Sequence, residues 1–206
     1  MGVYLHEEDL PAGLLAREGP LAVDTETMGL ALGRDRLCVV QISDGRGDEH
    51  LVRFAPGSSY DAPNLKAALG DPERLKIFHF ARFDLASIMA YLGVMAAPAY
   101  CTKTASRLIR TYTDRHGLKE LVRELLGEEI SKQQQCSDWG AEHLSDAQKE
   151  YAASDVRYLH ELREALDERL LREGRIELAD ACFEFLPHRA LLDLAGWAEI
   201  DIFAHV

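Results

Sequence analysis

Two carboxylates stand close together near the start of the chain. Asp24 and Glu26 lie in the segment Val23–Thr27, just after a short apolar run that is typical of a buried strand. Side chains two residues apart on a strand point to the same face, so both carboxylates would project together. Like charges held this close raise each other's pKa unless a cation neutralises them, and Mg²⁺ is a hard ion that prefers oxygen ligands. The pair is a candidate metal site, although a solvated strand end could carry the same residues by chance.

Two more segments carry acids that could complete such a site. Asp84 follows a second apolar run, Leu75–Phe80, and we expect it at the start of a helix, where an aspartate is also a common capping residue. Tyr151 and Asp155 are four residues apart in an expected long helix, so they share one face. Taken alone, this pair is more typical of a helix surface. Taken together, the four acids could converge on one metal site with a tyrosine beside them.

The order and local context of these motifs resemble the DEDD superfamily of 3′→5′ exonucleases, in its tyrosine-containing branch. The resemblance implies a ribonuclease-H-like α/β fold with a mixed central sheet flanked by helices. It also implies hydrolysis of a phosphodiester at a 3′ end with two divalent cations, Mg²⁺ or Mn²⁺. In the family's pattern Asp24 bridges both ions, and Glu26 and Asp155 complete the first. Asp84 supports the second ion, partly through water, and Tyr151 orients the attacking water.

Longer stretches narrow the resemblance to the ribonuclease D group and, closer still, to the nano-RNase C type, a short stand-alone oligoribonuclease. That type is associated with the degradation of dinucleotides and very short RNAs, including linear di-GMP, and with a homo-octamer. The resemblance therefore implies short RNA as the substrate and a homo-oligomer, and we expect none of the helical nucleic-acid-binding domains of ribonuclease D. The stretches that carry the resemblance are residues 132–139 and 151–159 for the ribonuclease D group, and residues 78–84, 110–120, 130–135 and 200–205 for the nano-RNase C type.

Other functions remain open. Within the same chemistry, the chain could be a broader 3′→5′ exonuclease on single-stranded RNA or DNA, including one that trims tRNA 3′ ends. The formal net charge of −12 argues against non-specific binding along a nucleic-acid backbone, and it favours a short substrate. In a different class, an exonuclease-like domain could bind nucleic acid or scaffold a complex without cutting it. That function would suit a chain that had lost a metal-binding carboxylate, and here all four acids and Tyr151 are present.

Candidate substrate contacts lie near the first two motifs. In related oligoribonucleases a leucine wedges between the two bases, and Leu30, which follows a glycine just past the first motif, looks like it. Bases stack on apolar surface without sequence preference, but a leucine at this place could also belong to the core. His79 could contact a sugar or a phosphate, or it could be a satisfied core residue. Thr25, between the first two acids, completes this set of candidates.

One basic window stands out in the acidic chain. Residues 103–123 hold six basic and two acidic side chains, a local net charge of +4. Lys103, Arg107 and Arg110 follow i, i+4, i+7 spacing, so they would share a helix face. Lys103 and Arg107 are candidates to hold a terminal 5′-phosphate. A solvated helix face or a contact between subunits would explain the same pattern.

The elements that must position these groups are short apolar runs early in the chain and helical periodicity later. Residues 145–148 match a capping box ahead of a long helix that carries Val156, Leu159, Leu162 and Leu166. Strands followed by helices indicate a mixed α/β domain. We expect strands at 21–23, 37–42, 50–54 and 75–80, and helices at about 63–69, from about 83, and at 118–126, the last ended by Gly127.

We expect a single exonuclease domain over residues 1–206. Its core would cover about residues 18–172, and the apolar extension at about 173–206 would pack either onto the domain or against another subunit. The most apolar stretch, residues 85–99, is shorter than the roughly 20 residues of a membrane span. The N-terminus lacks a cationic head followed by an apolar run, and no two of the four cysteines have CxxC spacing. These features predict a cytoplasmic protein with no membrane contact.

Overall fold

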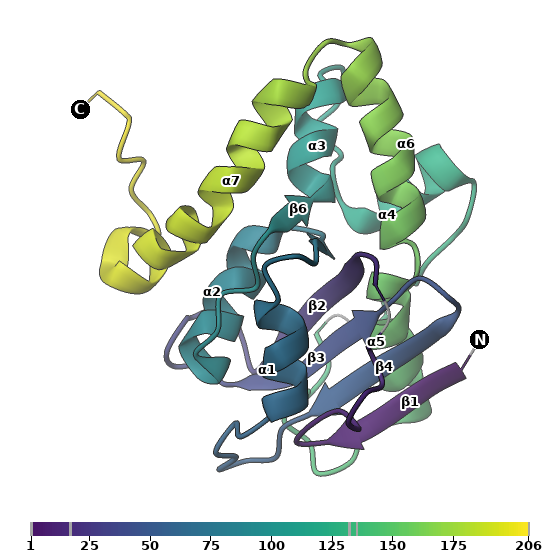
Figure 1. Cartoon of the computed structure of the whole chain (residues 1–206), viewed down its shortest axis with the longest axis vertical. Helices are drawn as coiled ribbons and strands as arrows, with labels where there is room; N and C mark the ends of the chain where they lie inside the picture. The colour runs from purple at the N-terminus through teal and green to yellow at the C-terminus, as the bar shows by residue number, and fades with distance from the viewer. Residues whose placement is uncertain (1, 17, 132, 135, 206) are drawn as a thin grey trace.

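A six-stranded mixed sheet forms the centre of the computed structural model, which describes residues 2–16, 18–131, 133–134 and 136–205 (Figure 1). The strand order is β1-β4-β3-β2-β5-β6. β3 is antiparallel to both β2 and β4, whereas β1 runs parallel to β4, β5 to β2, and β6 to β5. Lys132 and Gln135, which belong to the stretches compared above, lie outside the described residues. The expected mixed α/β fold class is confirmed.

The expected strands are present, and two of them have different ends. β2 continues through Thr27, so Asp24 and Glu26 lie within the strand rather than after it. β5 ends at Phe78, so His79 and Phe80 lie in the connection to the next helix. Two edge strands were missed, because one is short and the other is only half-buried along its length. The bounds are β1 Gly2–Glu7, β2 Leu21–Thr27, β3 Leu37–Ser43, β4 Asp48–Arg53, β5 Lys76–Phe78 and β6 Ala99–Cys101.

The helices begin close to the expected positions. The capping box is present: the Ser145 hydroxyl accepts from the Gln148 backbone N–H, and the Gln148 side chain accepts from the Ser145 backbone N–H. The expected long helix is two helices, because the regular helix is interrupted at Tyr158. The bounds are α1 Pro63–Gly70, α2 Ala81–Leu92, α3 Thr102–Ile109, α4 Leu118–Leu121 with its π-helical continuation η1 Val122–Leu126, α5 Asp146–Arg157, α6 Leu159–Arg172, α7 Ile176–Leu192 and the π-helical turn η2 Asp193–Trp197.

Helices cover both faces of the sheet and one of its edges. α5 packs on β2, β3 and β4 above a small apolar cluster that includes Val39, Leu51 and Trp139. α2 packs on β2, β3, β5 and β6 and contributes to the larger core, as do Leu65 and Leu69 of α1. α3, α6 and α7 contact one another beyond the β6 edge (Figure 1). A site at the end of β2 is therefore bordered by α5 on one side and α2 on the other.

The C-terminal extension contains two parts with different burial. α7 packs onto α2, α3, α6 and β6, and its Ala179, Phe183, Leu186 and Ala190 are buried. Beyond α7, Trp197, Ile200, Ile202 and Phe203 are 44%, 53%, 44% and 77% exposed. Packing onto the domain thus explains the helix, and it does not explain the last ten described residues. Among the described residues, none of the helices is long and apolar enough to cross a membrane.

Candidate functional site

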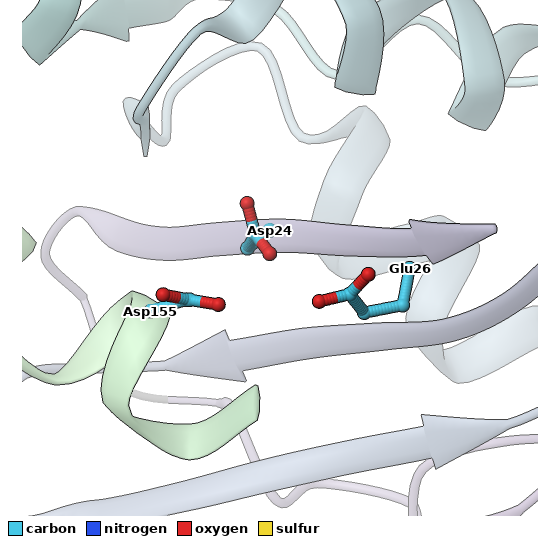
Figure 2. Close-up of side chains that lie close together, drawn as sticks. All are labelled: Asp24, Glu26 and Asp155. Atoms are coloured by element: carbon cyan, nitrogen blue, oxygen red, sulfur yellow. The ribbon is translucent and has the colours of Figure 1, made fainter. Parts of the chain in front are cut away.

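Three carboxylates from two distant segments meet between β2 and α5. Asp24 and Glu26 project from β2, Asp155 projects from α5, and one oxygen of each lies within 4.8 Å of the others. Figure 2 shows the three side chains facing a common space from the strand and the helix. All three are partly buried. This is the spacing at which one divalent cation could be bound by all three carboxylates.

Local structure explains why these groups meet. Strand alternation puts Asp24 and Glu26 on the face that α5 covers, and Thr25 on the opposite face. The register between β2 and β3 shifts at Glu26 and Thr27, an irregularity of the kind that re-aims side chains beside active sites. The capping box starts α5 two turns before Asp155, which orients the helix over the strand.

Burial and mutual repulsion dominate the electrostatics of the cluster. Burial raises the pKa of Asp24 to about 7. Burial, followed by the charges of Asp24, Asp155 and Asp84, raises the pKa of Glu26 to about 10. The three groups therefore cannot all be ionised near neutral pH without a compensating positive charge. A hard divalent cation held by carboxylate oxygens fits both the geometry and this charge requirement.

Tyr151 lies beside the carboxylates, one turn before Asp155 on α5. Burial and then the charges of Asp155, Glu26 and Asp24 raise its pKa above the ordinary value, so the side chain is a neutral phenol. Its ring packs against Trp139 with a centroid distance of 6.0 Å. The hydroxyl can donate and accept a hydrogen bond, but it is not a strong base.

Asp84 stands outside the group of three. It lies in the first turn of α2 and is 4% exposed, and the Thr25 hydroxyl donates to its Oδ1 at 2.6 Å. Burial, and next the charge of Asp24, raises its pKa well above the ordinary value. Asp84 therefore faces Asp24 from the α2 side. The expectation that Thr25 contacts substrate is corrected for its side chain, which is buried and bonded to Asp84.

The other candidate contacts have different environments. Leu30 is 83% exposed, so the interpretation of it as a core residue is wrong. His79 is half-buried, and its Nδ1 shares a hydrogen bond of 2.9 Å with the Thr102 hydroxyl at the start of α3. It is thus held in place at the loop that follows β5, and it is not part of the apolar core.

The predicted basic helix face is wrong in one of its three members. α3 ends at Ile109, so Arg110 turns inward, becomes 1% exposed and pairs with Glu124. Arg107 is exposed on the helix. The Lys103 ammonium lies 4.4 Å from the centroid of the Phe80 ring. Two cations therefore remain available at the surface of α3, and the third stabilises the fold.

Gln41 is a residue that the motifs did not reveal. It lies directly opposite Asp24 in the β2–β3 register, and it is fully buried. Within the described residues, neither its amide nitrogen nor its amide oxygen has a hydrogen-bond partner. Opposite residues of an antiparallel pair point to the same face, so this amide lies on the Asp24 side. Its signal in the sequence was a single amide inside the apolar run Leu37–Ile42.

We expect Mg²⁺ to stabilise the protein more at pH 8 than at pH 5. Unfolded carboxyl groups titrate near pH 4, whereas Asp24 and Glu26 do so at about 7 and about 10 in the folded chain. Between these values the folded state binds more protons, so stability without a cation falls as pH rises from about 4. A cation on the carboxylates removes that penalty. The measurement is thermal unfolding with Mg²⁺ or with EDTA at both pH values.

The size of the expected shift is a few degrees at pH 8, with little at pH 5. Asp24→Asn should abolish the difference between Mg²⁺ and EDTA. Asp146→Asn is the control, because the Asp146 side chain is fully exposed at the start of the same helix. An equal Mg²⁺ effect at both pH values would contradict binding at these carboxylates.

Comparison with known proteins places this geometry in context. Residues 7–171 match a family described as 3′-5′ exonuclease. A solved nuclease in its apo form is 59% identical, with a TM-score of 0.96 over 100% of this chain and 99% of the other. Brucella melitensis NrnC bound to pGG is 55% identical, with a TM-score of 0.95 over 100% and 98% of the two chains, and NrnC has also been solved with bound Mg²⁺.

Curated relatives are similar over a shorter share of their own length. Ribonuclease D of Gluconacetobacter diazotrophicus is 37% identical over 166 residues, which cover 79% of this chain and 41% of the relative. The chain thus spans about two fifths of the length of the first curated relatives that it matches.

Proposed function

Since the chain belongs to the 3′-5′ exonuclease family, we propose that it is a metal-dependent 3′→5′ exoribonuclease that hydrolyses short RNA oligonucleotides. We propose dinucleotides such as linear di-GMP as its preferred substrates. The observation that carries the proposal is the convergence of Asp24, Glu26 and Asp155 with Tyr151 beside them. The similarity to NrnC, which has been solved with pGG, supports the substrate class.

The carboxylates would bind two divalent cations, Mg²⁺ or Mn²⁺. Asp24, Glu26 and Asp155 would hold one ion, and Asp24 with Asp84 would hold the other. When bound, the ions would neutralise charge on the phosphate and make water more acidic. The Mg²⁺-bound structure of NrnC supports this proposal.

The chain's own residues have separable roles in this mechanism. Thr25 fixes Asp84 through its hydroxyl. Tyr151, a neutral phenol beside Asp155, would orient the attacking water by donating or accepting a hydrogen bond. Leu30, whose side chain is exposed, would separate the two bases, and Lys103 and Arg107 would attract the 5′-phosphate. His79, held by Thr102, would contact the sugar or the scissile phosphate.

The proposal is tested by single-turnover cleavage of 5′-labelled RNAs two to seven nucleotides long, with Mg²⁺ or Mn²⁺. We expect dinucleotides to be cleaved roughly tenfold faster or more, because one stacking or charged contact available only to the short substrate is worth about that much. Similar rates at every length would instead indicate a general exonuclease on longer RNA or DNA, including tRNA 3′ ends. Binding without cleavage in either ion would indicate a non-catalytic scaffold.

We further propose that residues 1–206 form one exonuclease domain whose C-terminal extension joins copies of the chain, as an octamer by resemblance to the nano-RNase C type. The exposed apolar residues after α7 support an interface there, since water is a poor solvent for them. The cytoplasmic location stays a prediction.

The tail contact predicts a change in assembly. The double variant Trp197→Asp, Phe203→Asp should sediment as a smaller species than the wild type at micromolar concentration, because two charges would enter an apolar contact. Leu171→Asp is the matched control, since Leu171 is 64% exposed and lies on α6 outside the extension. A wild-type chain that sediments as a monomer would contradict the proposal.

A further inference from the structure

Phe80 has a backbone conformation and an exposure that packing does not explain. It lies in the left-handed region with φ 73° and ψ 44°, where a residue with a side chain is disfavoured by roughly 1–2 kcal/mol. Its ring is nevertheless 42% exposed. An exposed aromatic ring contributes little to the core, and strained residues of this kind concentrate at functional sites. The strain therefore points to a role for the ring outside the fold.

The strand register places Phe80 at the edge of the sheet that carries the carboxylates. β5 runs parallel to β2, so the residues just after β5 lie beside the end of β2, with Thr25, Glu26 and the loop that leads to Leu30. Phe80 also directly precedes α2, whose first turn carries Asp84. The ring is thus one helical turn from an acid of the site.

A cation lies next to the ring. β6 runs parallel to β5 with Phe78 opposite Cys101, so Phe80 and Lys103 occupy equivalent places just past the two strands. The Lys103 ammonium is 4.4 Å from the ring centroid. His79, between β5 and Phe80, is held by Thr102, which immediately precedes Lys103. An aromatic surface and a positive charge therefore stand together beside the carboxylates.

We propose that Phe80 is a substrate-binding residue: one base of the dinucleotide stacks on its ring while Lys103 faces the adjoining phosphate. This inference rests on the proposed function and adds a base contact to it. Stacking tolerates every base, because each has a flat π surface, which suits an enzyme that clears dinucleotides of any sequence. The strain at Phe80 is then the cost of presenting a ring outward at a loop that must also start α2.

The test separates this role from a structural one by replacing Phe80 with glycine. Phe80→Gly removes the ring and also relieves the left-handed strain, so the variant should unfold at the wild-type temperature or above it. Its KM for pGG should rise roughly five- to a hundredfold with kcat little changed, because the lost contact is made in the bound ground state as well as in the transition state. Phe80→Tyr should restore the wild-type KM.

Dinucleotides that lack one base provide the second readout. In the wild type, removal of the stacked base should raise KM as much as Phe80→Gly does, and the two changes together should raise it no further. Tyr4→Ala is the matched control, because Tyr4 is a 48% exposed aromatic on β1 at the opposite edge of the sheet. It should leave KM unchanged.

Each outcome decides one point. If wild-type protein does not cleave pGG with Mg²⁺ or Mn²⁺, the proposed function fails, whatever Phe80 does. If the wild type cleaves pGG and Phe80→Gly keeps its KM, or if base removal and Phe80→Gly act independently at both positions, the stacking role is wrong. A changed sedimentation coefficient in Phe80→Gly with no loss of base dependence would assign the ring to a contact between copies and overturn the inference.

Discussion

Asp155→Ala is expected to lower kcat for dinucleotide hydrolysis by more than about 10³-fold. Residues that only support metal ligands typically cost 10- to 100-fold when removed, so loss of a direct carboxylate ligand should cost more. Asp155 is the one member of the close group that comes from α5 and not from β2. Without it, the remaining pair offers an open strand face in place of a three-sided site. Single-turnover assays with saturating Mg²⁺ or Mn²⁺ would measure the loss.

Unfolding can be excluded as the cause of this loss. The charge of Asp155 raises the pKa of Glu26, so its removal relieves repulsion in the partly buried cluster. Cation-free Asp155→Ala should therefore unfold at the same temperature as the wild type or higher at pH 8. Asp146→Ala makes the same change on the same helix at a fully exposed side chain, and it should keep wild-type rates. Wild-type rates in Asp155→Ala would show that the site assignment is wrong.

Lys76→Met is expected to cause the largest loss of stability among the changes considered. Lys76 is fully buried, and its ammonium donates to the backbone carbonyls of Asp71, Arg74 and Ala97 at 2.7, 2.6 and 2.5 Å. Burial lowers its pKa to about 8, so the side chain is still protonated at pH 7. Methionine would fill the space but leave three carbonyls without a donor, at about 1–3 kcal/mol for each buried group.

The expected destabilisation is roughly 3–5 kcal/mol, which for a chain of this size lowers the unfolding temperature by roughly 6–20 °C. The three carbonyls lie where the chain enters β5 and β6, and the far ends of those strands lead to His79, Phe80 and Thr102. Thermal unfolding at pH 7 and matched protein concentration measures the effect. Lys149→Met, at a surface pair with Asp146, should change stability by less than about 0.5 kcal/mol. Equal effects of the two variants would refute the role of Lys76 in joining these segments.

Local patterns in the sequence predicted much of the fold. The apolar runs at β3 and β4, the capping box at Ser145 and the mixed α/β class depend on side-chain alternation, helical period and cap chemistry, all of which act over a few residues. The errors fall where local signals are weak. β6 has three residues, too few for a periodic pattern, and the break at Tyr158 lies inside a sequence whose period continues on both sides.

The environments of single side chains could not be read in the same way. Leu30 and Arg110 have the types of a core residue and a surface residue, yet Leu30 is exposed and Arg110 is buried on Glu124. The burial of a side chain depends on which distant segment covers it. Phe80 shows the same limit, because its left-handed backbone follows from joining β5 to α2 and leaves no trace in residue type.

The sequence by itself determined which chemical groups are present and their local settings: Asp24 and Glu26 two apart on a strand, and Tyr151 and Asp155 four apart on a helix. Only the tertiary structure decided that Asp155 joins the first pair while Asp84 stands apart, tied to Thr25. The physical reason is range. Strand alternation and helical spacing act between near neighbours, whereas a metal-binding distance and a raised carboxyl pKa arise from segments up to 131 residues apart that packing brings together.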